Sequence, residues 1–437
     1  MSSADRVTGH GSRVKGQGSR RAGETPFMTS NLRPYLEVYR SRRIGMMLIF
    51  GFSSGLPLAL TGGTLQAWMT VVGVDLRTIG IFSLVGLPYT LKFLWSPLMD
   101  RYVPPWLGRR RGWMISTQVA LFFAIFAMAF GSPQHAVGTV ALLALFVAFA
   151  SASQDIVVDA YRTDLLHEEE RGAGTAVYVM GYRIAMLVSG AGALILSDRI
   201  GWRNTYLLMA IVMVVGMIGA LFGPEPEIQA KPPKTLREAV WGPLRDFFSR
   251  HRAVSILLFI VLYKLGDAYA GTLTTAFLIR GAGFTPTDVG TVNKGLGLIS
   301  LIVGATIGGS VMVRLGLFRS LLFFGMLQAV SNLSFMALAW VGKSYPMMIF
   351  AVAFENLAGG MGTAAFVAFL MGLCDHRYSA TQFALLSSLA VLGRVFISPT
   401  SGYVVESLGW ANFFFLTALT ALPGLGLLWW LRTDISD

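Results

Sequence analysis

Residues 44–72 have the sequence IGMMLIFGFSSGLPLALTGGTLQAWMTVV, which contains no charged side chain. About 20 consecutive apolar residues are enough to cross the hydrocarbon core of a bilayer as a helix, so this stretch is long enough to span a membrane. Comparable, mostly apolar stretches follow at 113–131, 254–279 and 323–341. Several such stretches in one chain predict an all-α, polytopic membrane protein rather than a protein with a single anchor.

The composition of the whole chain agrees with this prediction. Hydrophobic residues make up 54% of the 437 residues and charged residues 13%, which is roughly half the charged fraction of an ordinary soluble domain. The mean hydropathy is +0.61. A soluble fold with this composition would have to expose too much apolar surface to water.

The apolar stretches and the polar residues between them predict about twelve spans in two six-helix halves. The spans are expected near 44–72, 78–99, 113–131, 138–161, 173–197, 202–222, 253–280, 289–313, 320–342, 345–374, 381–405 and 410–431. The expected domains are a tail at 1–43, one half at 44–222, a linker at 223–252, the other half at 253–432 and a short tail at 433–437.

The two predicted halves resemble one another in sequence. Gly63-Thr64-Leu65 in the first span recurs as Gly271-Thr272-Leu273 in the seventh, and Gly80 and Gly290 follow at nearly matching distances. A parallel repeat of six spans is typical of transporters that bind their substrate between two halves, near the midplane of the bilayer. The repeat therefore favours a transporter.

The net charge of +12 reflects topology and gives no support to a nucleic-acid partner. Of the 35 Arg and Lys residues, about 25 fall in the termini and alternate loops and about five in the intervening loops. This asymmetry predicts that both termini and the loops at 100–112, 162–172, 223–252, 314–319 and 375–380 lie on the cytoplasmic side of a bacterial inner membrane.

Two of these cytoplasmic segments have distinctive compositions. Residues 1–43 are basic, lack the apolar core of a cleavable signal peptide and are expected to be mostly disordered. In the 223–252 linker, apolar residues at helical spacing among basic residues predict an amphipathic helix on the membrane surface. A solvated extension of the seventh span fits this pattern equally well. The apolar residues are Leu236, Val240, Leu244 and Phe247.

The loop between spans two and three combines an aspartate with a basic cluster, in SPLMDRY at 96–102 and GRRR at 108–111. It resembles the signature of the major facilitator superfamily, with Ser96 in place of the usual glycine and with residues 103–107 inserted. An acid at a helix end can pair with basic groups in one conformation only. The alternative for the arginines is that they take no part in such a lock and only hold the loop on the cytoplasmic side. The predicted gating motif consists of Asp100, Arg101, Gly108 and Arg109.

Acidic side chains within spans are costly in hydrocarbon and usually face a cavity or a partner. Asp155 and Asp159 lie four residues apart on one face of span four, where two close carboxylates would titrate as a coupled pair, as in a proton carrier. Pairing with Arg183, which would only fix helix packing, is the alternative. The predicted proton-coupling residues are, in order of preference, Asp155, Asp267, Glu355 and Asp159.

Five cations also lie within predicted spans: Lys92, Arg183, Lys264, Lys294 and Arg394. A carboxylate leaves water readily only where cations meet it, so these side chains are candidates to bind an anionic part of the substrate. Lys264 and Lys294 have fewer obvious local partners and are preferred, although Lys264 and Asp267 could satisfy one another. Arg183 and Arg394 could instead be locked to acids in their own halves.

Two glutamines, Gln66 and Gln154, could bind sugar hydroxyls or simply join helices. No HExxH or GxxxxGK[ST] motif is present. Cys374 is the only cysteine, which excludes an intramolecular disulfide, and the five histidines fall in the tail or in predicted loops. We therefore expect no enzymatic activity, no metal and no cofactor, and we expect uphill transport to depend on an ion gradient.

Longer strings resemble a narrower family, the AmpG muropeptide permeases of the major facilitator superfamily. They include LPLALTGGTLQAWM from Leu56, LKFLWSPLMDRY from Leu91, SQDIVVDAYRTD from Ser153 and FENLAGGMGTAAFVAFLM from Phe354. The resemblance extends over nearly the whole chain and includes the insertion at 103–107. Only the basic N-terminal tail lies outside it.

The resemblance implies a major facilitator fold and the import of N-acetylglucosaminyl-anhydro-muramyl peptides from periplasm to cytoplasm by a monomer in the lipid bilayer. It also implies drive by the proton gradient and a role in peptidoglycan recycling and in β-lactamase induction, and hence in β-lactam resistance. A carrier of acetyl-CoA or of a drug is the second hypothesis, because intramembrane cations suit a CoA phosphate equally well. A non-transporting membrane sensor is the third, and the retained acids argue against it.

Overall fold

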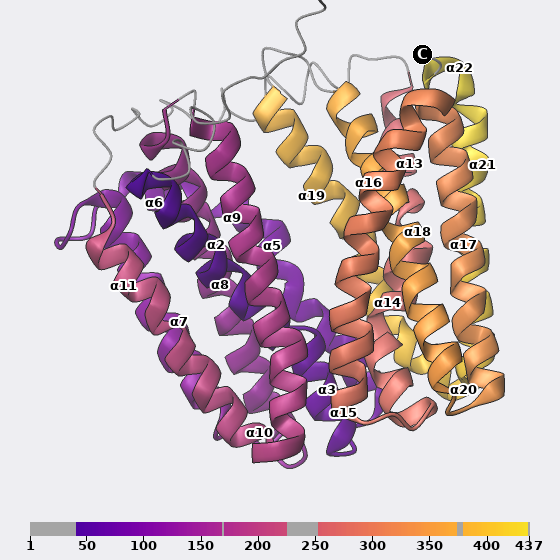
Figure 1. The fold of residues 1–437 in the computed structure, drawn as a ribbon, viewed down its shortest axis with the longest axis horizontal. Coiled ribbons are helices and arrows are strands. Elements are labelled where there is room, and N and C mark those ends of the chain that lie inside the picture. Colours follow the sequence, from indigo (N-terminus) through magenta and orange to yellow (C-terminus); the bar gives the residue numbers. More distant parts are fainter. Residues whose placement is uncertain (1–40, 168–169, 225–251, 374–378, 436–437) are drawn as a thin grey trace, which may run out of the picture.

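The computed structural model describes residues 41–167, 170–224, 252–373 and 379–435. Within these ranges every regular element is a helix (Figure 1). The predictions of a disordered tail and of an amphipathic linker helix fall on residues 1–40 and 225–251, outside the described residues.

In the first half, the second span is the most broken one, and η5 of the fifth span is π-helical. The second span consists of short helical pieces, since Pro88 and Pro97 remove backbone donors and interrupt the regular helix. The elements are α2 (Arg42–Thr61), α3 (Gly63–Val71), α4 (Leu76–Ile81), η2 (Phe82–Gly86), α5 (Leu87–Leu91), η3 (Lys92–Leu94), α6 (Ser96–Arg101), α7 (Arg109–Met128), α8 (Val137–Leu165), α9 (Arg171–Met186), η5 (Leu187–Gly192), α10 (Ala193–Val212) and α11 (Val214–Phe222).

In the second half, three spans contain a segment that departs from α-helical geometry. Two of these segments, η6 and η7, are π-helical. The elements are α13 (Ala253–Tyr263), α14 (Leu265–Ala276), η6 (Phe277–Gly281), α15 (Pro286–Asp288), η7 (Val289–Leu296), α16 (Gly297–Leu315), α17 (Leu317–Val341), α18 (Tyr345–Gly372), α19 (Ser379–Ile397), η8 (Ser398–Thr400), α20 (Ser401–Leu419), α21 (Leu422–Trp430) and α22 (Arg432–Ile435).

Nine helical segments of the described chain are long and apolar enough to cross a membrane, which confirms a multi-pass membrane protein. Two of them, Gly174–Phe222 and Leu386–Trp430, have 49 and 45 residues, too many for one crossing. Each turns at a glycine with positive φ, Gly201 at 77° and Gly409 at 79°, a conformation that other residues rarely adopt. Division at these glycines, together with the broken segment from α4 to α6, accords with the twelve predicted spans.

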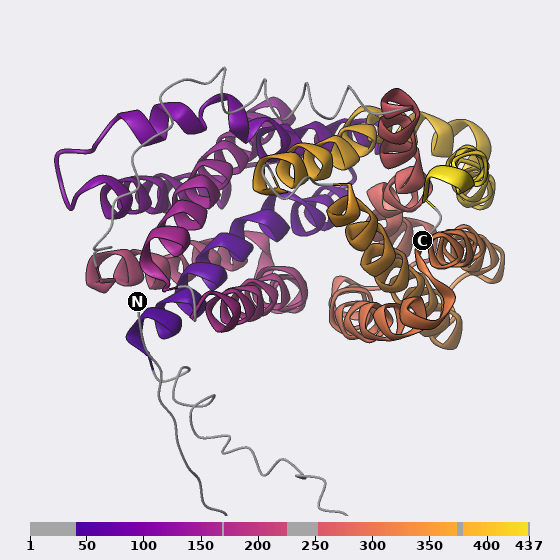
Figure 2. The same cartoon turned by 90° about the horizontal axis from the view of Figure 1, so that it is seen from above.

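Figures 1 and 2 show the elements up to α11 and those from α13 onward as two groups of helices that lie side by side. Within each group, glycines allow helices to touch. A Cβ at Gly51 of α2 would overlap the carbonyl oxygen of Tyr178 in α9, and a Cβ at Gly360 of α18 would overlap that of Leu301 in α16. Such contacts between small residues are a common way to hold helices together in a bilayer.

The two halves contact each other toward the lower face of Figure 1, where α3, α10, α15 and α20 are labelled. A Cβ at Gly80 in α4 would lie 3.1 Å from Oγ of Ser401, at the start of α20. A Cβ at Gly290 in η7 would lie 2.9 Å from the carbonyl oxygen of Ala191 in η5. Gly80 and Gly290, which the sequence repeat relates, therefore both lie where one half meets the other.

Candidate transport site

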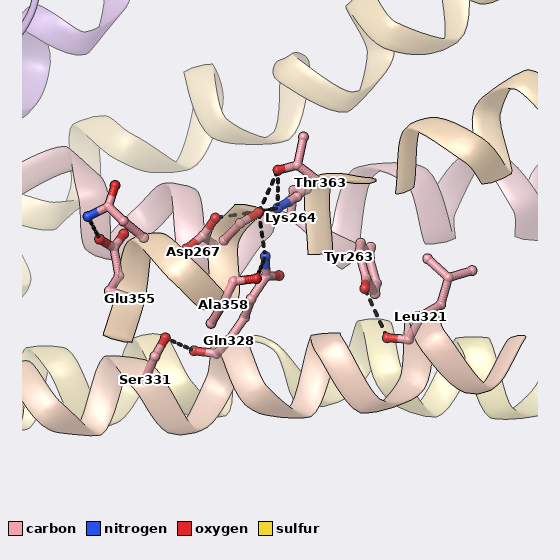
Figure 3. Close-up of polar contacts among 11 residues, drawn as sticks. Tyr263, Lys264, Asp267, Leu321, Gln328, Ser331, Glu355, Ala358 and Thr363 are labelled. Atoms are coloured by element: carbon pink, nitrogen blue, oxygen red, sulfur yellow. Dashed lines mark hydrogen bonds and ion pairs between the residues drawn. The ribbon is translucent and has the colours of Figure 1, made fainter. Parts of the chain in front are cut away.

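Charged side chains gather inside the second half. Nζ of Lys264 lies 3.6 Å from Oδ2 of Asp267 and donates a hydrogen bond of 3.1 Å to Oγ1 of Thr363 (Figure 3). Lys264 is placed at the break between α13 and α14, so its side chain reaches α18. The expectation that Lys264 has few local partners is therefore wrong, because an acid three residues away neutralises it.

Glu355 lies on α18, farther along the same cluster (Figure 3). Its carboxylate accepts a hydrogen bond of 2.7 Å from the side-chain amide of Asn356. Lys264 and Lys294 are near enough to interact with it electrostatically, but no cation lies within 4.0 Å of it among the described residues. Glu355 is thus a half-buried carboxylate with a neutral hydrogen-bond donor as its direct partner.

Lys294 extends from the second half to the first. It lies on η7, a π-helical segment, and such segments are frequent at functional sites. Its Nζ donates a hydrogen bond of 3.3 Å to Oγ1 of Thr275. A Cβ at Gly63 in α3 would lie only 2.9 Å from the same Nζ, so the absence of a side chain at Gly63 leaves room for the ammonium group. In the described chain Lys294 has no carboxylate within ion-pair distance.

Arg183 on α9 and Arg394 on α19 lie on the spans that the repeat relates. Neither of them forms an ion pair or a hydrogen bond within the ranges that the structure describes. Arg394 is exposed and interacts electrostatically with Asp267 and Lys294. The alternative that both arginines are locked to acids of their own halves has no ion pair to support it.

The two acids of span four have different surroundings. Asp159 lies between two cations, 3.8 Å from Nζ of Lys92 and 3.2 Å from Nη2 of Arg162. Oδ1 of Asp155 is buried without a hydrogen-bond partner among the described residues, as is Oγ of nearby Ser54. A neutral carboxyl is less costly to bury than a carboxylate, so Asp155 meets a requirement for a group that takes up and releases a proton.

Both predicted glutamines contact other helices. Gln66 in α3 donates a hydrogen bond to the carbonyl oxygen of Thr272 in α14 and so links the two halves. Gln154 in α8 is fully buried and donates a 3.3 Å hydrogen bond to Oγ of Ser53 in α2. These contacts match the alternative left open by the sequence, that the glutamines join helices.

The predicted gating motif is described only in part. The side chains of Asp100 and Arg101 lie outside the described residues, so the charge lock stays a prediction. Gly108 has φ of 75° and precedes α7, where its positive φ suits glycine. Arg109, in the first turn of α7, is buried.

The arginines that follow tie the loop to neighbouring helices. Nε of Arg110 lies 2.9 Å from Oδ2 of Asp164 at the end of α8, and both side chains are almost fully buried. Nε of Arg111 donates a hydrogen bond of 3.0 Å to the carbonyl oxygen of Ala220 in α11. These contacts within one half agree with an anchoring role for the two arginines.

Polar contacts that the sequence did not predict join the halves toward the lower face. Arg280, in η6, donates hydrogen bonds of 2.9 and 2.7 Å to the carbonyl oxygens of Thr70 and Val74. Arg77 in α4 forms an ion pair with Glu406 in α20. The charge asymmetry contained a signal for Arg77 alone, which lies between the predicted spans 44–72 and 78–99 and outside the predicted cytoplasmic loops, whereas Arg280 is the last residue of the predicted span 253–280.

One further motif was overlooked. Residues 51–55, GFSSG, match the GxSxG pattern of hydrolases, in which the serine is exposed on a sharp turn between a strand and a helix. Here the whole pentapeptide lies inside α2, and Oγ of Ser53 is hydrogen-bonded to the carbonyl oxygen of Phe50. This structural context does not fit a hydrolase nucleophile.

Comparison with known proteins identifies the family. Residues 46–343 match the model of the Major Facilitator Superfamily. The chain is 57% identical over 395 residues to the anhydromuropeptide permease of Escherichia coli K12, an alignment that covers 90% of this chain and 80% of that protein. The chain belongs to the AmpG permease family. A second member, putative transporter AmpG 4 of Rickettsia conorii, is 35% identical over 92% of this chain and 99% of its own length.

Solved structures show that this AmpG family member has the major facilitator fold. A POT family transporter superposes with a TM-score of 0.71 at 14% identity, covering 91% of this chain and 97% of that one. The nucleoside transporter NupG also superposes with a TM-score of 0.71 at 14% identity, covering 90% and 99%. At such low identity the similarity extends to the fold alone.

Proposed function

We propose that the chain imports anhydro-muropeptides, N-acetylglucosaminyl-anhydro-muramyl peptides, from periplasm to cytoplasm by proton-driven alternating access. The observation that carries this proposal is the 57% identity to a protein named anhydromuropeptide permease, over 90% of the chain. At this identity the substrate class is expected to be shared. The transported products would feed peptidoglycan recycling, and the chain would act as a transporter and not as an enzyme.

The charges of the site support a substrate with carboxylates. An anhydro-muropeptide has sugar hydroxyls, acetamido groups and peptide carboxylates, and the carboxylates must lose water to enter the membrane interior. Of the five intramembrane cations, Lys92 and Lys264 are paired with Asp159 and Asp267. Lys294 has only a hydroxyl partner, and Arg183 and Arg394 have no ion-pair or hydrogen-bond partner in the described chain. We therefore assign the peptide carboxylates to Lys294, Arg183 and Arg394.

The deciding experiment is uptake of a radiolabelled anhydro-muropeptide into proteoliposomes that contain the purified chain. We expect uptake that requires an imposed inward proton gradient and collapses when an uncoupler is added. Acetyl-CoA in excess should not compete. Flux of acetyl-CoA without flux of the muropeptide would replace the proposal with the second hypothesis, and no flux of either would favour the sensor.

Topology provides a first prediction. The upper face of Figure 1 contains α22 and the end of the described chain, and the charge bias assigns this face to the cytoplasm. Reporter fusions after Gly223 and after Asp437 are therefore expected to be active only as cytoplasmic reporters. A periplasmic signal from either fusion would overturn the assignment of the spans.

A second prediction concerns the contacts between the halves. A Cβ at Gly402 would overlap backbone atoms of Leu76 in the other half. Gly402→Leu is therefore expected to push the halves apart at the lower face, at a cost of about 1–3 kcal/mol to the closed state. In a Cys374→Ser background, a reporter cysteine at Gly271 should then react about tenfold faster with an impermeant maleimide applied from the periplasmic side.

The control for this experiment is Gly309→Leu, because a Cβ at Gly309 of α16 meets nothing within 4 Å. The reporter position is also free of nearby atoms, so Gly271→Cys should not disturb the helix. Equal labelling of the Gly402→Leu and Gly309→Leu proteins would mean that the lower face does not open, which would contradict alternating access through it.

A further inference from the structure

A hollow of about 720 Å³ lies at the upper end of the second half, away from the cluster of the transport site. It is formed where α16 ends, α17 begins and α22 begins. Arg314, Arg319 and Arg432 contribute to its wall, one from each of these three helices. The turn between α16 and α17 and the distant start of α22 thus bring three guanidinium groups to one place.

The described part of the chain does not balance the charges of this hollow, since no acidic side chain lines it there. All three arginines are exposed, and none of them forms an ion pair or a hydrogen bond in the part of the chain that the structure describes. Cations of like charge that converge create a positive potential, which attracts an anion.

The remaining wall of the hollow is apolar and accessible. Val313 is 85% exposed, and Phe318 packs against Trp429 with their ring centroids 6.2 Å apart. The guanidinium carbon of Arg432 lies 5.4 Å from the centroid of the Trp429 ring, a cation–π contact that orients this arginine. Tryptophan is enriched where the hydrocarbon core meets the headgroups, so this hollow lies at the level of the lipid headgroups.

We propose that this hollow binds the headgroup phosphate of an anionic phospholipid. Arginine pairs with phosphate through two parallel hydrogen bonds, and three arginines can enclose one phosphodiester. The acyl chains would lie along Val313 and Phe318, which a soluble phosphate would leave uncovered. Basic pockets between membrane helices bind anionic headgroups in this way. The site differs from the transport site in position, ligand and chemistry.

Native mass spectrometry of the purified full-length chain tests this site. Phosphatidylglycerol and cardiolipin are each titrated against phosphatidylcholine, and the apparent Kd of the lipid adduct is measured. The protein is expected to bind the anionic lipids and not phosphatidylcholine at the same concentration. Each arginine near an anionic lipid contributes about fivefold, so R314Q/R319Q/R432Q should weaken binding about a hundredfold. The single variant Arg319→Gln should weaken lipid binding about fivefold. This variant replaces the triple variant in the test if the triple variant does not fold.

The matched control removes three exposed cations from the lower face, in the variant R199Q/R203Q/K343Q. Arg203 and Lys343 also contact aromatic rings, so both triple variants lose equal charge and similar contacts. The control should bind anionic lipid like the wild type. Equal weakening in both triple variants would overturn the site, because the attraction would then depend on net charge alone. Displacement of the lipid by millimolar inorganic phosphate would assign the hollow to a soluble ligand instead.

Discussion

Replacement of Lys294 by glutamine is expected to lower the uptake of a free-acid anhydro-muropeptide by about tenfold to a hundredfold. A hydrogen bond to a charged group contributes about 1.5–3 kcal/mol, and a carboxylate taken out of water loses this contribution when its cation is removed. The Lys294→Gln variant should take up the same substrate with amidated peptide carboxylates nearly as well as the wild type does. Initial rates of uptake of both substrates into proteoliposomes measure the difference.

Three further variants test the geometry behind this prediction. Arg394→Lys keeps the charge but loses the paired hydrogen-bond geometry, so it should show a smaller, acid-selective loss than Arg394→Gln. Lys92→Gln is the matched control, because Lys92 already has an acidic partner, 3.8 Å away. Equal losses for the free-acid and the amidated substrate in both the Lys294 and Arg394 variants would mean that these cations serve structure or gating.

The number and order of the helices could be predicted because each membrane span must satisfy its own backbone hydrogen bonds over a fixed thickness. An apolar stretch such as 44–72 therefore predicts its helix from local sequence alone, and α2 and α3 cover nearly the same residues. The turns at Gly201 and Gly409 separate helices at the predicted places. The π-helical turns were not predicted, since nothing in the local composition distinguishes them from α-helix.

Partners of charged side chains were harder to predict, because they depend on how helices far apart in sequence pack. Lys264 and Asp267 are three residues apart, so their ion pair could be anticipated. The approach of Lys294 to Gly63 in the other half could not, since it requires the relative position of η7 and α3. The repeat marked Gly80 and Gly290 as related, but their shared place between the halves emerged only from the structure.

The surroundings of the four predicted coupling acids divide them into two groups. Asp159 and Asp267 each have a cation within 4.0 Å. Asp155 and Glu355 have no such cation within the described chain. A residue that alternately binds and releases a proton needs its neutral form to be accessible, so Glu355 and Asp155 fit that task better than the paired acids.

Glu355→Gln and Asp155→Asn are accordingly expected to abolish accumulation of muropeptide against its gradient while exchange of internal for external substrate survives. One proton that moves down about 150 mV supplies roughly 3.5 kcal/mol, enough to concentrate a neutral substrate a few hundredfold. Without the coupling group this ratio should fall to about one. Accumulation ratios and counterflow rates in proteoliposomes measure the two properties separately. Normal accumulation of muropeptide in both variants would mean that another residue carries the coupled proton.

Variants of Asp267 can distinguish an acid that only neutralises Lys264 from an acid that carries the proton. Asp267→Asn leaves Lys264 as an unpaired, partly buried cation, which is unfavourable away from bulk water. If Asp267 only neutralises Lys264, the double variant D267N/K264Q should recover accumulation that Asp267→Asn loses. If Asp267 moves the proton, the double variant should remain uncoupled while its exchange activity returns. We expect recovery of accumulation, since the 3.6 Å ion pair already accounts for this acid.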